Sequence, residues 1–167
     1  MSDIVVSNSS PLIYLAKLNR LTLLRSLFSE VSIPSEVYNE VVRKGKQHGF
    51  LEVKCVERAF EEGWMKVREA KRERKLLMFQ ELDLGEVEVL SLAIQLKASL
   101  VLIDDASGRL VAEALGLNSK GTVYVILSAA RAGAITKGEA KNLITELISA
   151  GFWISSEIVG KILNELG

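Results

Sequence analysis

The stretch from Ala98 to Leu117, ASLVLIDDASGRLVAEALGL, constrains the fold more than any other part of the chain. A short apolar run ends at two adjacent carboxylates, Asp104 and Asp105, and a helical pattern begins directly after them. A short run that is apolar throughout is typical of a strand buried on both faces, so the stretch predicts a β–α unit. Side chains at a strand end alternate between the two faces, so the two aspartates need not share one face.

The same succession of strand and helix recurs along the chain. We expect strands at 4–6, 31–34 and 100–103, with a further short strand at 64–67, and helical patterns between them. No assignment stands out for residues 66–82. Strands separated by helices predict a three-layer α/β/α fold with a mainly parallel sheet of about four or five strands, followed by two C-terminal helices. Residues 1–133 are expected to form the α/β domain and 134–167 a helical extension packed on it.

Three helix boundaries are also predicted. Gly45 is expected to end the helix that starts in SEVYNEVVRK. Thr122 is expected to cap the helix of GTVYVILSAARAG, with Gly133 ending it.

Composition limits the classes of function. The 21 basic and 21 acidic residues balance, so any contact with nucleic acid must be local. With a lone Cys55 and a lone His48, an intramolecular disulfide and a zinc site of cysteines or histidines are excluded. No apolar run approaches ~18 residues, and the N-terminal stretch lacks the features of a signal peptide, so we expect a cytoplasmic protein without a membrane partner.

Several polar side chains lie at sequence positions that this fold would bring to the same edge of the sheet. Asn8 follows the first strand, Glu40 and Glu86 lie on helices that could face the same rim, and the Asp104–Asp105 pair ends a later strand. Open α/β sheets bind ligands beyond the carboxyl ends of their strands. Oxygen ligands of this kind suit Mg²⁺ or Mn²⁺, and converging carboxylates repel one another unless a cation neutralises them.

Four segments, taken in order and spacing, resemble the PIN-domain family. They are NSSPLI, IPSEVYNEV, LGEVEVLSLA and LIDDASGR. The resemblance covers roughly residues 3–133, and the last two helices resemble the C-terminal extension of one PIN-like branch. It implies a Mg²⁺- or Mn²⁺-dependent endoribonuclease that hydrolyses RNA phosphodiester bonds and is often the toxin of a toxin–antitoxin pair. The partners it implies are RNA, an antitoxin protein and a second copy of the chain.

The acidic positions of the family map onto this sequence one by one. Glu86 lies seven residues before Ala93, and the same count back from Ala112 gives Asp105, whereas strand alternation leaves Asp104 open. The catalytic residues implied by the resemblance are Glu40, Glu86, Asp104 and Asp105. The implied metal ligands are Asn8, Glu86, Asp104 and Asp105. The implied substrate-binding residues, through hydrogen bonds to phosphate or to a carboxylate, are Ser9, Ser10 and Arg109.

One position departs from the family. Asn8 offers a neutral carbonyl where the family usually has a carboxylate, and Asp3 lies about 16 Å away along an extended strand. The rival hypothesis is therefore a PIN-derived module that binds RNA or a protein without cutting. An α/β phosphohydrolase of small esters ranks last, because no aspartate nucleophile motif follows the first strand.

Each candidate also has an ordinary structural interpretation. Residues 8–10 could only cap a helix, Glu40 could be a solvated helix residue, and Glu86 could interact with the positive end of its helix, with Asp83 or Gly85 as the cap. Asp104 and Asp105 could be a cap and a turn residue.

Other features have similar alternatives. The basic run at 66–75 could be a solvated helix face or an RNA-backbone contact. We interpret Trp64 and Trp153 as packing residues. An apolar face for dimerisation could come from the first helices, through Leu12, Leu15, Leu18, Leu23, Leu24 and Leu27.

Overall fold

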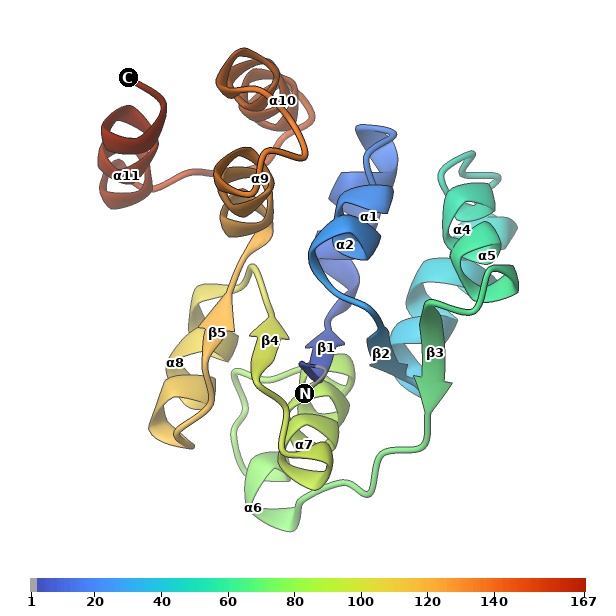
Figure 1. Ribbon diagram of the computed structural model, residues 1–167. Helices are drawn as coiled ribbons and strands as arrows, with labels where there is room; N and C mark the ends of the chain where they lie inside the picture. Colours follow the sequence, from blue (N-terminus) through green and yellow to red (C-terminus); the bar gives the residue numbers. More distant parts are fainter. Residues whose placement is uncertain (1–2) are drawn as a thin grey trace.

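The computed structural model describes residues 3–167 and contains a five-stranded sheet whose strands all run parallel (Figure 1). The strands are β1 (Val5–Ser7), β2 (Val31–Pro34), β3 (Met65–Arg68), β4 (Leu100–Leu102) and β5 (Ser119–Lys120). Their order across the sheet is β3-β2-β1-β4-β5. The predicted three-layer α/β/α fold with a parallel sheet is confirmed.

Helices connect the strands and complete the chain. Before β3 they are α1 (Ser9–Lys17), α2 (Thr22–Leu27), α3 (Ser35–Tyr38), the π-helix η1 (Asn39–Arg43), α4 (Lys44–Gln47) and α5 (Val53–Glu61). After β3 they are α6 (Arg74–Leu77), α7 (Leu84–Leu96), α8 (Ala106–Ala114), α9 (Thr122–Arg131), α10 (Lys137–Ser149) and α11 (Ser156–Leu166). Within residues 3–167, none of these helices has the length and apolar character needed to cross a membrane.

The connections of the sheet reverse direction between β1 and β4. From β1 the chain moves through β2 to β3 at one edge, whereas from β4 it moves to β5 at the other. Because parallel crossovers are right-handed, the helices of the two halves lie on opposite faces. The two strands are joined beyond β1 by the backbone N–H of Asn8, which donates to the carbonyl of Leu102 at 2.9 Å. A crevice at such a reversal is where open α/β sheets bind ligands.

Strands covered on both faces explain the uninterrupted apolar runs of the sequence. Val6, Val101 and Leu102 are fully buried, and α7 packs against β1, β2 and β4. Four of the six leucines proposed for a dimer face are buried in this core, because α9 and α5 of the same chain pack against the first helices: Leu12, Leu15, Leu23 and Leu24. Leu18 and Leu27 are only partly buried, so they are the part of the proposed face that stays accessible.

Two of the three predicted helix boundaries differ from the structure, whereas Gly133, with a φ of 77°, follows the C-cap of α9 as predicted. The chain passes through Gly45 into α4, because the side chain of Val53 packs where a Cβ at position 45 would stand. Gly121 takes the N-cap position of α9, and Thr122 is the first helical residue. The hydroxyl of Thr122 therefore does not cap α9, and it donates instead to Asp104, just beyond β4.

The basic run at 66–75 is not a continuous helix. Its first residues form β3, where Lys66 and Arg68 pair with Glu30 at 3.1 and 2.7 Å. Further along, the guanidinium of Arg72 donates twice to Glu88, at 2.9 and 2.7 Å. Half of the six basic residues therefore pair with two acids of the same chain, which weakens the RNA-backbone interpretation of this segment.

The C-terminal helices lie beyond the sheet. Helix α10 packs against α9, and α11 packs against α10 (Figure 1). Thr136 and Glu139 form the capping box that begins α10, with hydrogen bonds of 2.9 and 3.0 Å. This pair follows directly from the sequence pattern.

Candidate active site

Residues 8–10 tie the end of β1 to two separate parts of the chain. Asn8 is 9% exposed, and its side chain makes no capping hydrogen bond to α1. The hydroxyl of Ser9 donates to Glu40 Oε2 at 2.6 Å, and the hydroxyl of Ser10 donates to Asp104 Oδ2 at 2.7 Å. Successive serines thus reach one acid on η1 and another after β4, so this turn does more than begin a helix.

Glu40 lies in the π-helical segment η1. Single π-helical turns are rare and occur frequently at functional sites. Besides its bond from Ser9, the carboxylate approaches the start of α7, where a Cβ at Gly85 would lie 2.6 Å from Glu40 Oε1. Burial raises the pKa of Glu40, and the nearby charge of Asp83 raises it further. Glu40 is therefore a partly buried carboxylate directed at the α7 N-terminus and not a freely solvated helix residue.

Glu86 has one satisfied and one unsatisfied carboxylate oxygen. Its Oε1 accepts from the N–H of Asp83 at 3.1 Å, while its own N–H donates to Asp83 Oδ1 at 2.7 Å, which forms a capping box. Its Oε2 is buried and has no hydrogen-bond partner. Burial raises the pKa of Glu86 to about 7, with further contributions from the charges of Asp83 and Asp105. A buried carboxylate oxygen without a donor needs a proton or a cation for compensation.

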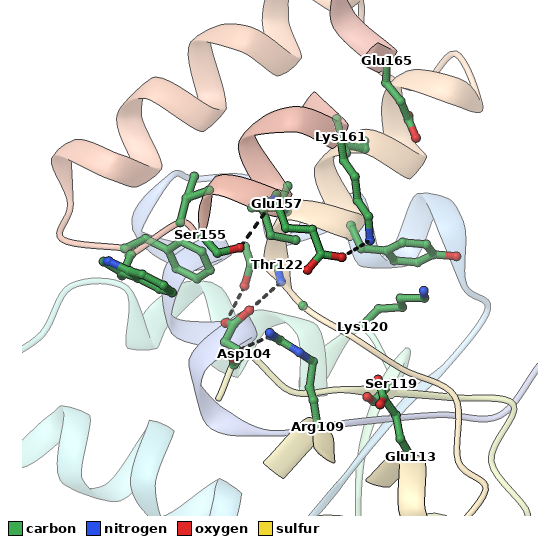
Figure 2. A pocket seen from close by; sticks show the side chains of 18 of the residues that line it. Asp104, Arg109, Glu113, Ser119, Lys120, Thr122, Ser155, Glu157, Lys161 and Glu165 are labelled. Atoms are coloured by element: carbon green, nitrogen blue, oxygen red, sulfur yellow. Dashed lines mark hydrogen bonds and ion pairs between the residues drawn. The ribbon is translucent and has the colours of Figure 1, made fainter. Parts of the chain in front are cut away.

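The two adjacent aspartates have different surroundings. Asp105 Oδ2 accepts from the N–H of Gly108 at 2.9 Å and caps α8, and its charge acts on Glu86. The carboxylate of Asp104 instead accepts from the N–H and the hydroxyl of Thr122, both at 2.7 Å, and from Ser10 (Figure 2). Asp105 therefore belongs with Glu86, whereas Asp104 joins β4 to α1 and α9.

Arg109 holds the end of β4 from the next helix. Its Nη1 donates to the backbone carbonyl of Asp104 at 2.7 Å and, more weakly, to that of Ile103 at 3.5 Å (Figure 2). The guanidinium makes no ion pair among residues 3–167. Its remaining N–H groups are available for an anion such as a phosphate.

Three glycines make room for the acids. A Cβ at Gly85 would lie 2.6 Å from Glu40, one at Gly108 2.6 Å from Glu86, and one at Gly121 2.7 Å from Asp104. No side chain fits at these distances without moving the carboxylate. Sequence reasoning missed all three, although each glycine lies within three residues of a candidate site residue or of Thr122, at the start of a helical pattern.

The donors present suit a divalent cation with few protein ligands. Within residues 3–167 no three Asp, Glu, His or Cys side chains gather closely enough to hold a metal ion by themselves. Mg²⁺ keeps several water molecules and is commonly bound through one or two carboxylates. Glu86, with its unpartnered Oε2, and Asp105, whose charge acts on Glu86, are the carboxylates that would hold such a cation, and Asn8 follows the neighbouring strand β1.

Fold and site together define an α/β protein with acidic residues at the reversal point of a parallel sheet. The model of the family DUF3368, described as a PIN domain, matches residues 4–167. The chain therefore belongs to the PIN-domain family, whose members are generally nucleases and usually bind divalent metal ions. The match includes α10 and α11, so the C-terminal helices are part of the family pattern.

A solved structure supports the fold. A PilT N-terminus domain protein, SSO1118, from the hyperthermophilic archaeon Sulfolobus solfataricus P2 superimposes with a TM-score of 0.54 at 19% sequence identity. The alignment covers 75% of this chain and 92% of the archaeal chain. No curated protein matched the sequence.

Proposed function

We propose that this protein is a Mg²⁺- or Mn²⁺-dependent endoribonuclease that hydrolyses RNA phosphodiester bonds. The observation that carries the proposal is the buried, unpartnered Oε2 of Glu86, whose carboxylate also feels the charge of Asp105. A cation bound beside Glu86 would compensate its buried oxygen and favour the ionised carboxylate. Because the members of this family are generally nucleases, we assign phosphodiester hydrolysis to that cation site.

In this proposal the metal is held by Glu86 and Asp105, with Asn8 as a neutral ligand. When bound, a divalent ion would neutralise carboxylate and phosphate charge and lower the pKa of a nearby water, which would make that water a better nucleophile toward phosphorus. Glu40 receives a proton from the attacking water, because its raised pKa makes it a stronger base than an ordinary carboxylate. The hydrogen bond from Ser9 fixes the orientation of this carboxylate.

Two further predicted site residues take supporting roles. Asp104 is a positioning residue: with its three hydrogen bonds to Ser10 and Thr122 it fixes the end of β4, so that Asp105 is directed toward Glu86. Arg109 is oriented by the backbone carbonyl of Asp104 and offers its remaining N–H groups to a substrate phosphate.

A second candidate function is binding of RNA or protein without cleavage. Asn8 favours it, because a carboxamide contributes no charge to the cation site. The toxin role, with an antitoxin protein and a second copy of this chain as partners in the cytoplasm, is proposed together with the nuclease activity.

The test is a cleavage assay on a panel of single-stranded and structured RNAs with Mn²⁺, with Mg²⁺ or with EDTA. We expect cleavage by the parent with either metal, none in EDTA, and none by Asp105→Asn, which keeps an N-cap side chain but loses the charge. Metal-independent cleavage, or no cleavage of any RNA, would refute the proposal. For the toxin role, expression of the parent should arrest growth of a bacterial host and expression of Asp105→Asn should not.

A further inference from the structure

A cleft of about 500 Å³ lies next to Asp104, between the α/β domain and the C-terminal helices (Figure 2). One wall comes from α8, β5 and α9, with Arg109, Lys120 and Tyr124. The other comes from the loop after α10 and from α11, with Trp153 and Lys161. The C-terminal extension therefore builds about half of this cleft.

The cleft adjoins the acidic site. Asp104 lines it, and the next residue, Asp105, interacts with Glu86. A strand whose scissile phosphate lies at Glu86 and Asp105 would thus place a flanking nucleotide in the cleft.

Trp153 is the most unusual side chain of the cleft. It is 80% exposed, whereas Trp64 is 6% exposed, so the packing interpretation is confirmed for Trp64 and is wrong for Trp153. The residues around Trp153 are fixed: the ring of Phe152 packs edge-on against Tyr14 at 5.0 Å, and Ser155 caps α11 at 3.3 Å. An exposed indole between two anchored residues is a preorganised surface for stacking.

The charges of the cleft are balanced. Four basic and four acidic residues line it, and two of the basic ones are paired, Lys161 with Glu157 at 3.9 Å and Arg131 with Glu165 at 3.2 Å. Lys120 makes no ion pair within the described part of the chain, and its ammonium lies 5.6 Å from the ring centre of Tyr124. Two cations, Lys120 and Arg109, are therefore available to a phosphate, so electrostatic attraction alone would bind RNA weakly.

We propose that the cleft binds a single-stranded RNA segment flanking the cleaved bond, with one base stacked on Trp153 and a phosphate on Lys120. This inference rests on the proposed function, since it assigns a substrate strand to the acidic site. Base stacking on an exposed aromatic ring tolerates any sequence. Bases inside a duplex are already stacked on one another, so the site selects single strands.

The test measures RNA binding without cleavage, in EDTA and on the Asp105→Asn background. Trp153→Ala should weaken binding of a short single-stranded RNA by about fivefold to 150-fold, the range for loss of one stacked base. The matched control is Leu163→Ala, because Leu163 is a 64% exposed apolar residue of α11 that does not line the cleft, and its substitution should leave affinity unchanged. Single-stranded RNA should also quench the fluorescence of Trp153, whereas duplex RNA should not.

Each outcome separates this inference from the proposed function. Unchanged affinity of Trp153→Ala, or equal competition by duplex RNA, overturns the cleft assignment even when the parent cleaves RNA. A change in oligomeric state of Trp153→Ala with unchanged RNA affinity also overturns it and marks the surface as a protein interface. Binding that depends on Trp153, in a protein whose parent never cleaves RNA, supports the cleft and refutes the nuclease proposal.

Discussion

Gly108 on α8 faces the unpaired carboxylate oxygen of Glu86 on α7, and a Cβ at position 108 would lie 2.6 Å from that oxygen. The same Cβ would lie 3.0 Å from the side chain of Ile103, which is fully buried and has little room to move. The contact between α7 and α8 therefore depends on the absence of a side chain at position 108.

We predict that Gly108→Ala displaces the Glu86 carboxylate and lowers Mn²⁺ affinity and RNA cleavage by about tenfold or more, which corresponds to about 1.4 kcal/mol. The measurements are calorimetric titration with Mn²⁺ and initial cleavage rates. Gly160→Ala is the control, because a Cβ there meets no atom within 4 Å, and this change should stabilise α11 by roughly 0.5–1 kcal/mol. Equal metal affinity of the two variants would contradict the role assigned to Glu86.

We expect Asp104 to contribute mainly to stability and Asp105 mainly to metal-dependent cleavage. Asp104→Ala removes three hydrogen bonds and leaves the N–H and hydroxyl of Thr122 without their acceptor. We predict a loss of about 2–4 kcal/mol in the free energy of unfolding, measured by urea denaturation. Asp105→Asn keeps the α8 cap and should cost less than about 1 kcal/mol while abolishing metal-dependent cleavage. Asp104→Ala with unchanged stability would show that the Asp104 carboxylate does not join the three elements as described.

Four of the five strands were predictable from short apolar or partly apolar runs, whereas β5, which consists of Ser119 and Lys120, has no such run and was not predicted. Local patterns were also sufficient for the capping box of α10. What failed depended on distant contacts. Gly45 resembles a helix stop, but the side chain of Val53 excludes a Cβ there and the helix continues. The apolar face of α1 looks available in sequence, but it is buried by α9 and α5.

The candidate site was predictable in composition but not in detail. Strand alternation did not distinguish Asp104 from Asp105 as a metal ligand. Only the position of Thr122 on α9 shows that the Asp104 carboxylate is already engaged in hydrogen bonds. The π-helix at Glu40 has no local signal in the sequence. The glycines opposite the carboxylates are marked only by their positions near candidate residues, because the carboxylates that approach them come from other parts of the chain. Exposure of Trp153 likewise depends on how Phe152 anchors the loop against α1.

The stability of the metal-free protein should depend on the protonation of Glu86. Burial raises the pKa of this carboxyl from 4.5 to about 7, so the folded state binds the proton more tightly than the unfolded state. Stability from this group is therefore fully present below pH 4.5 and is lost as pH rises through about 7. We predict a loss on the order of 2–3 kcal/mol, or about 5–10 °C in Tm, between pH 4.5 and 8 in EDTA.

Glu86→Gln isolates this effect, because the amide keeps the shape of the side chain and does not titrate. Its Tm, followed by circular dichroism, should fall less than that of the parent over the same pH range, whereas the exposed Glu146→Gln should follow the parent. Added Mg²⁺ should raise the Tm of the parent more at pH 8 than at pH 5, since metal and proton compete for the carboxylate. Parallel curves for the parent and Glu86→Gln would contradict a raised pKa at this position.

Asn8→Asp tests whether the missing charge limits the site. Position 8 is 9% exposed, so a carboxylate there is destabilising without a cation and favourable with one. We predict a lower Tm in EDTA, a higher affinity for Mn²⁺ by about tenfold, and faster RNA cleavage than the parent. Asn142→Asp, at an exposed position of α10, is the control and should change none of the three. If Asn8→Asp gains neither metal affinity nor cleavage, Asn8 lies outside the metal shell.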